Sequence, residues 1–83
     1  EKPTSIQIDL RGKRVEQALS DLDIFLNRSL VSNLEKIYIL HGKGTGALME
    51  SIQKFLKKQP YVKSYKFAND DIGGVGLTEV ILK

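Results

Sequence analysis

Hydrophobic and polar residues alternate from Ile6 to Leu10, and this period of two is typical of a strand with one buried and one polar face. We therefore predict a strand over residues 5–10. From residue 14 the apolar positions recur every three or four residues along one stripe, which predicts a helix over residues 14–30. Ile24 falls outside this stripe. The stripe is formed by Val15, Ala18, Leu19, Leu22, Leu26 and Leu30.

Four further elements follow along the chain. The pattern predicts a strand over residues 36–41, a helix over 46–58, and strands over 62–67 and 77–82. Pro60 prevents extension of the second helix, because proline lacks the backbone N–H and clashes with the preceding turn. Residues 69–71 (Asn-Asp-Asp) are typical turn residues, and residues 73–76 (Gly-Gly-Val-Gly) continue this loop. The element order is therefore βαβαββ.

This order predicts a two-layer α/β fold. Two consecutive right-handed crossovers place both helices on one face of the sheet only if the first three strands advance in the same direction. The last strand then pairs antiparallel with the third through a hairpin, either outside it or between the second and third strands. We favour a four-stranded mixed sheet with the strand order 1-2-4-3 and an open second face. In that order the ends of the first two strands and the start of the last lie at one edge, where one ligand can contact all three.

Length and composition narrow the class of protein. The chain has 83 residues and no break in composition, which predicts a single domain over residues 1–83. The absence of cysteine excludes disulfides and thiolate zinc sites and agrees with a cytoplasmic location. No apolar run is long enough to span a bilayer, so we expect no membrane partner. A net charge of +3 permits polyanionic partners. Because the first residue is not methionine, we expect a fragment of a longer protein.

The most informative segment is His41-Gly42-Lys43-Gly44-Thr45-Gly46, which lies between a predicted strand and a predicted helix. Glycines let the backbone approach a ligand closely, a helix N-terminus directs free N–H groups and a positive dipole end at it, and Lys43 adds a full charge. The segment thus predicts an anion site, although a tight turn would use the same glycines. It matches neither a Walker A loop nor a Gly-x-Gly-x-x-Gly fingerprint. Nucleoside triphosphates are therefore disfavoured, and a phosphodiester phosphate is the candidate ligand.

Charged residues near the ends of the first two strands are further candidates. Asp9 lies on the polar side of its strand, where it acts either as a metal ligand or general base, or as a partner of Arg11 or Lys13. Arg11, Lys13 and Arg14 precede a helix N-terminus, where an arriving anion would relieve their conflict with the helix dipole. His41, the only histidine, is either a structural residue or one that transfers protons near neutral pH.

A metal site built on histidine lacks further ligands at a zinc-like spacing. The remaining candidate ligands are scattered carboxylates, namely Asp9, Asp70, Asp71 and Glu79. The alternative is a single hard cation, magnesium or manganese, held by Asp9 and by the phosphate of a substrate.

Aromatic and basic residues in the second half of the chain allow two interpretations each. The aromatic residues of the third strand stack on bases at the open face or pack in the core; they are Tyr61, Tyr65 and Phe67. The lysines form a solvated surface or attract a nucleic-acid backbone over long range; they are Lys54, Lys57, Lys58, Lys63 and Lys66.

Three segments taken together resemble the signature segments of the Smr (small MutS-related) domain family. They are Ile8-Asp9-Leu10-Arg11-Gly12, the segment His41-Gly42-Lys43-Gly44-Thr45-Gly46 and Gly73-Gly74-Val75-Gly76-Leu77-Thr78-Glu79-Val80, and they cover nearly the whole chain in the right order. The first two are most similar to the domain at the C-terminus of the second bacterial MutS paralogue, an ATPase that suppresses homologous recombination and is linked to stalled ribosomes. The resemblance implies a βαβαββ fold similar to the C-terminal domain of translation initiation factor three. It also implies nucleic-acid binding and, in many members, endonuclease activity.

By position, the resemblance implies that Asp9, Arg11 and His41 are catalytic, with Asp9 as the metal ligand. It also implies that Lys43, Gly44, Thr45 and Gly46 hold the phosphate backbone. We further expect nucleic-acid contacts by Arg11, Lys13, Arg14, Gly74 and Thr78. Many active members carry histidine at the position of Arg11. The guanidinium of Arg11 would instead stabilise negative charge in the transition state.

We therefore expect a domain that binds branched or nicked DNA, or RNA including that of the ribosome, and nicks it with low sequence specificity. In the expected mechanism Asp9 activates the attacking hydroxyl, directly or through a divalent ion, and His41 protonates or orients the leaving oxygen. The alternatives are a non-catalytic module that docks a larger ATPase on branched DNA or ribosomal RNA, and a protein-interaction domain that uses the open sheet face. ATP would be bound only by the rest of a parent protein, which is expected to be a homodimer, whereas the isolated domain is expected to be a monomer.

Overall fold

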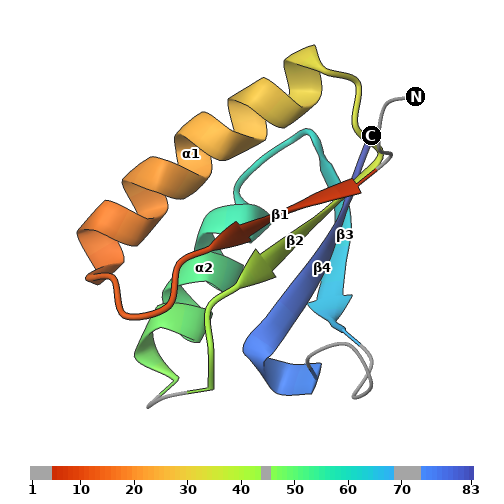
Figure 1. The fold of residues 1–83 in the computed structure, drawn as a ribbon. Helices are drawn as coiled ribbons and strands as arrows, with labels where there is room; N and C mark the ends of the chain where they lie inside the picture. Colours follow the sequence, from red (N-terminus) through yellow and green to blue (C-terminus); the bar gives the residue numbers. More distant parts are fainter. Residues whose placement is uncertain (1–4, 44–45, 69–73) are drawn as a thin grey trace.

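The computed structural model describes residues 5–43, 46–68 and 74–83. Its elements follow the order predicted from the sequence (Figure 1). They are β1 (Ser5–Asp9), α1 (Val15–Val31), β2 (Lys36–Leu40), α2 (Ala47–Lys57), β3 (Val62–Phe67), the 3-10 helix η2 (Gly74–Gly76) and β4 (Leu77–Leu82). The predicted helix and strand ends are correct to within one residue, whereas η2 forms where the sequence predicts only loop. Within the described ranges, no helix has the length and apolar character needed to cross a bilayer.

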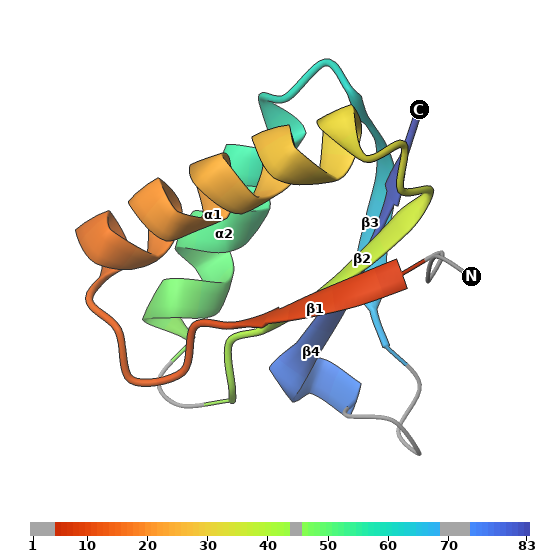
Figure 2. The ribbon, with the colours of Figure 1, turned by 45° about the horizontal axis from the view of Figure 1, so that its top comes forward.

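The four strands form one mixed sheet in the order β1-β2-β4-β3, as predicted. β1 and β2 are parallel, and β4 is antiparallel to both of its neighbours. α1 and α2 lie against the same face of the sheet, and neither of these helices covers the other face (Figures 1 and 2). The two-layer α/β architecture expected from the element order is therefore confirmed.

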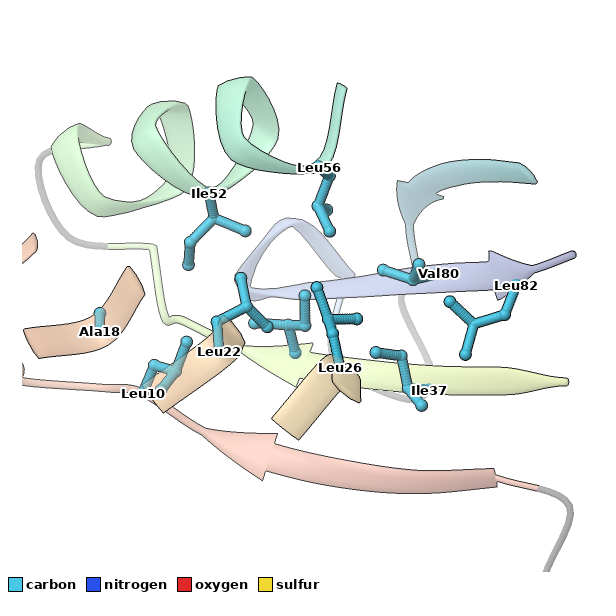
Figure 3. Packing of buried hydrophobic residues seen from close by; sticks show 10 residues of the cluster. Leu10, Ala18, Leu22, Leu26, Ile37, Ile52, Leu56, Val80 and Leu82 are labelled. Carbon is cyan, nitrogen blue, oxygen red and sulfur yellow. The ribbon is translucent and has the colours of Figure 1, made fainter. Parts of the chain in front are cut away.

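The core fills the space between the helices and the sheet (Figure 3). Ile37 and Ile39 are fully buried and alternate with less buried residues along β2, as the period of two requires. Ile24, which falls outside the apolar stripe of α1, is 50% exposed. The buried cluster consists of Leu10, Ala18, Leu22, Leu26, Ile37, Ile39, Ile52, Leu56, Val80 and Leu82.

The aromatic residues of β3 face the helices and not the open side. Tyr65 pairs with Val80 and Phe67 pairs with Thr78, and both partners are fully buried residues of β4. Directly paired residues of neighbouring strands point to the same face of a sheet. Tyr65 therefore lies on the helix side, where it packs partly buried against the core together with Tyr61. Of the two interpretations, packing against the core is confirmed for Tyr61 and Tyr65, whereas Phe67 is 38% exposed at the end of β3.

The open face carries a polar network centred on Glu79. The hydroxyl of Tyr38 donates to Glu79 Oε2 at 3.3 Å, and the Nζ atom of Lys36 lies 3.5 Å from the same oxygen. The Nζ atom of Lys66 lies 3.8 Å from Glu79 Oε1. Glu79 thus offsets one of the two lysine charges, so this face is a weaker attractant for a polyanion than the lysine content of the chain suggests.

Candidate functional site

Three segments that are distant in sequence meet around Gly42. The backbone N–H groups of His41 and Gly42 both donate to the carbonyl oxygen of Gly76, at 3.1 and 3.0 Å, which ties the end of β2 to the entry of β4. The stem of Arg11 lies against Gly42, since a Cβ built on this glycine would stand 3.4 Å from Arg11 Cγ. The structure therefore brings the three predicted segments together at one edge of the sheet.

The sequence prediction did not include Gly42 and Gly76 among the contact residues. Gly42 has a φ of +78°, in the left-handed region that favours glycine. A Cβ on Gly76 would stand 3.5 Å from the Gly42 backbone, so both residues allow a close approach of two backbones. Their place in glycine-rich segments was the available signal. Spacing alone does not tell which glycine of a segment meets the protein and which meets a ligand.

Asp9 and Arg11 form a bidentate ion pair just beyond the end of β1. The Nε and Nη2 atoms of Arg11 donate to Asp9 Oδ1 and Oδ2 at 3.0 and 2.9 Å, and the backbone N–H of Arg11 also donates to Oδ1 at 3.0 Å. Hydrogen bonds from the Arg11 side chain and backbone hold the pKa of Asp9 below its usual range. Asp9 is therefore ionised at neutral pH, and its basicity is reduced. Arg11 keeps unused donors that face solvent.

His41 is buried, with 5% of its surface exposed, and both of its ring nitrogens have partners. Nδ1 lies 2.8 Å from the carbonyl oxygen of Gly42, and Nε2 lies 2.7 Å from the hydroxyl oxygen of Thr78. For a proton to pass between this ring and a substrate, one of these two contacts would have to break.

The side chains of Asp9 and His41 lie on different faces of the sheet edge. Asp9 is paired with Leu40, whose neighbour Ile39 is fully buried under the helices, so alternation places Asp9 on the open side. His41 contacts Thr78, the direct partner of Ile39, and is therefore on the helix side. Within the part of the chain that the structure describes, no hydrogen bond joins the two side chains. The expected joint action of these two groups on one phosphate has no direct contact to support it.

The basic side chains of the candidate site differ in whether they form ion pairs within the protein or are exposed to solvent. Lys43 is exposed next to Gly42. The Nζ atom of Lys13 lies 2.9 Å from Asp21 Oδ2, and the hydrogen bond from Lys13 lowers the pKa of that aspartate. Arg14 is exposed at the N-cap of α1. Lys43, Arg14 and the outer edge of Arg11 are thus available to a polyanion, whereas Lys13 is engaged within the protein.

The N-terminus of α2 adds backbone donors to the same region. Its N-cap residue is Gly46, with a φ of +88° and no side chain that could cap the first turn. The N–H groups of that turn, together with the positive end of the helix dipole, are the features that bind phosphate at helix N-termini. Glu50 supplies one opposing charge in this first turn. Gly44 and Thr45, which the sequence also predicts as contacts, lie outside the described residues.

Two further predicted contacts are buried. Thr78 is fully buried behind His41, so its hydroxyl reaches a ligand only through that imidazole. Gly74 is buried in η2 with a φ of +57°. Thr78 therefore supports the site through His41, and the burial of Gly74 leaves it little surface for a direct contact with a ligand.

The residues of this site fit a bound metal ion poorly. No group of three or more histidine, cysteine, aspartate or glutamate side chains that could hold a metal occurs in the described ranges. Both oxygens of Asp9 accept hydrogen bonds from Arg11, which places a positive charge where a cation would bind. Asp70 and Asp71 lie outside those ranges.

Comparisons with known proteins agree on one family. A sequence model of the Smr domain matches residues 8–83. The chain is 46% identical over 81 residues to the endonuclease MutS2 of Fusobacterium nucleatum, and 46% identical over 77 residues to that of Staphylococcus epidermidis. These matches cover 98% and 93% of this chain, respectively. The chain spans only 10% of the length of each relative.

Two solved structures share the fold. The crystal structure of the Smr domain of Thermus thermophilus MutS2 superposes with a TM-score of 0.90 at 39% identity, covering 93% of this chain and 96% of that one. The stand-alone small MutS-related protein YdaL from Escherichia coli gives a TM-score of 0.89 at 24% identity, covering 93% of this chain and 63% of YdaL. The second match supports the fold alone.

Proposed function

This chain belongs to the Smr domain family, and from that premise we propose that it binds nucleic acid through the phosphate backbone and nicks it as an endonuclease of low sequence specificity. The observation that carries this proposal is the packing of Arg11 against Gly42, next to the exposed Lys43 and shortly before the N-cap of α2 at Gly46. All three features bind phosphate without reading bases. The proposed reaction, cleavage of a phosphodiester bond, is based on the relatives, which are named endonucleases.

In the proposed reaction a water molecule attacks the phosphorus atom, the bond from phosphorus to one ester oxygen breaks, and the leaving oxygen takes a proton from solvent water. Arg11 and Lys43 hold the non-bridging oxygens and stabilise the charge that develops on them. Asp9, whose carboxylate contacts Arg11, accepts the proton of the attacking water when the phosphate competes for the Arg11 guanidinium. Among the described residues, Arg11 occupies the place beside Asp9 where a cation would bind, so the proposed reaction does not use magnesium or manganese.

A cleavage assay tests the proposal. Supercoiled plasmid and single-stranded RNA are incubated with the domain in EDTA, magnesium or manganese, and the parent is compared with Asp9→Ala. We expect Asp9→Ala to lose nicking while its affinity for the same substrates stays within about twofold. Asp23→Ala removes an exposed carboxylate from α1 and serves as the matched control. Nicking by Asp9→Ala at the parental rate would show that Asp9 takes no part in the chemistry. Nicking by the parent only with an added metal would show that the reaction requires a divalent cation.

A second function, a non-catalytic docking module, is favoured by the occupation of both Asp9 oxygens by Arg11. In this case the domain would hold a longer protein on branched DNA or ribosomal RNA. It predicts salt-sensitive binding that Lys43→Ala weakens, with no turnover under any metal condition. The wider roles proposed for such a longer protein are ATP binding, dimerisation, suppression of recombination and contact with the ribosome.

A further inference from the structure

A continuous chain of contacts connects β4 to the glycine segment through His41. The hydroxyl of Thr78 meets Nε2 of His41 at 2.7 Å, and Nδ1 of the same ring meets the carbonyl oxygen of Gly42 at 2.8 Å. Thr78 is fully buried and His41 nearly so. Water therefore has little access to the contact with Thr78, and both nitrogens of the imidazole have partners within the protein.

The partners of the ring determine which nitrogen carries the proton. A carbonyl oxygen only accepts hydrogen bonds, so Nδ1 must donate its proton to Gly42. In the neutral ring Nε2 is then an acceptor, and the hydroxyl of Thr78 donates to it. The opposite tautomer would direct the lone pair of Nδ1 at the carbonyl oxygen, which is repulsive at this distance. Of the two neutral tautomers, the local structure thus selects the one with its proton on Nδ1.

The same contact fixes the peptide group between Gly42 and Lys43. A trans peptide is planar, with its C=O and N–H bonds pointing in opposite directions, and no cis peptide occurs among the described residues. Because the Gly42 carbonyl points inward to the buried imidazole, the N–H of Lys43 points away from that ring. The left-handed φ of Gly42, +78°, permits this turn.

We propose that His41 is a positioning residue, held by Thr78, that turns the Gly42–Lys43 peptide so that the N–H of Lys43 becomes a phosphate donor. The backbone N–H and the ammonium group of Lys43 then act on one anion, with the stem of Arg11 close to Gly42. The identity of this anion as a nucleic-acid phosphate rests on the proposed function. The proton on Nδ1 and the orientation of the peptide do not.

The first test reads the imidazole directly. His41 is the only histidine in the chain, so ¹⁵N labelling of histidine gives one pair of ring nitrogens. In the neutral ring we expect a protonated Nδ1 and an unprotonated Nε2, the opposite of the form that free histidine prefers. A proton on Nε2, or rapid exchange between both forms, would overturn the proposal whether or not the domain binds nucleic acid.

The second test follows the amide of Lys43 by ¹H–¹⁵N NMR while a twelve-nucleotide oligothymidylate is added. Thr78→Val keeps the shape of the side chain but removes the hydroxyl, and Thr78→Ser restores it. We expect a downfield shift of the Lys43 amide in the parent and in Thr78→Ser, and in Thr78→Val a smaller shift with an affinity weaker by about fivefold, as expected for one lost hydrogen bond. Lys43→Gln keeps the amide, so at saturation its shift should persist.

The outcomes separate the two levels of the proposal. If Thr78→Val binds and shifts as the parent does, the positioning role is refuted. If the parent gives no response to the oligonucleotide while the ring tautomer is as expected, the proposed function fails and the peptide orientation stands. If Thr78→Val does not fold, the ring measurement on the parent decides alone.

Discussion

At the scale of single residues, the Asp9–Arg11 pair is the clearest feature of the site, and its geometry makes a prediction about charge. Arg11→Lys removes the planar fork that bonds both carboxylate oxygens. We expect the pKa of Asp9 to rise toward its ordinary value of 3.8, as measured by a carboxyl ¹³C NMR titration. An unchanged pKa would mean that the pair does not persist in solution.

The direction of this shift fixes its pH dependence. A lowered pKa means that folding stabilises the ionised carboxylate, so the contribution is present above the unfolded value near 3.8 and is lost as the pH falls through the folded value. The pair is therefore intact over the whole neutral range. The sequence allowed Asp9 to be either a base or a partner of Arg11. Arg11 lies two residues beyond the end of β1, where the direction of a side chain depends on the turn and not on the alternation of the strand.

Gly42 gives a second prediction at this scale. Gly42→Ala introduces a Cβ at positive φ and 3.4 Å from Arg11 Cγ, whereas Gly12→Ala introduces the same strain at a φ of +77° with no atom within 4 Å. The left-handed conformation costs about 1–2 kcal/mol for a residue with a Cβ. By urea denaturation we expect both variants to lose about this much stability, with the larger loss at Gly42. Nuclease activity or phosphate affinity should fall only in Gly42→Ala; equal losses would separate Gly42 from the site.

At the scale of elements, the chain was predictable where one physical signal dominated. The stripe of α1 gave its position, and the helix ends where Asn33 adopts a positive φ of 58° and the N–H of Leu34 bonds to the carbonyl of Ser29. The sequence left open whether Tyr65 and Phe67 face the core or the open side, because both faces of an edge strand hold few apolar residues and alternation alone does not identify the buried one. The side of the His41 ring was not predictable for a related reason, since it follows from a contact with Thr78, 37 residues away.

The packing of α2 on the sheet can be tested with a matched pair of variants. Leu56 is 1% exposed, and Leu56→Ala should destabilise the domain by about 2–5 kcal/mol through lost burial and a residual cavity. Ile24→Ala, at a position that is 50% exposed, should cost no more than about 0.5 kcal/mol. Natural domains of this size unfold with about 4–12 kcal/mol, so Leu56→Ala should be close to unfolding at elevated temperature. Urea midpoints that fall equally in the two variants would contradict the assigned burial.

At the scale of the whole molecule, function depends on where the positive charge is placed more than on its amount. The net charge of +3 is small, Lys13 is paired with Asp21, and Lys36 and Lys66 share Glu79 on the open face. The edge around Gly42 is different, because exposed Lys43 lies there beside the α2 N-terminus. A polyanion should therefore bind at this edge and not across the sheet.

The salt dependence of binding measures this difference. Each phosphate contact that releases a counterion from single-stranded DNA contributes about 0.7 to the slope of log Kd against log salt. Lys43→Gln should therefore weaken oligothymidylate binding and reduce the slope by about 0.7. Arg28→Gln removes one positive charge from the last turn of α1, which is not part of the glycine segment. This variant should therefore leave the slope unchanged. If both variants reduce the slope equally, binding follows total charge and the convergence around Gly42 has no special part in it. A slope that changes only in Lys43→Gln would instead place a phosphate at the edge where the three segments meet.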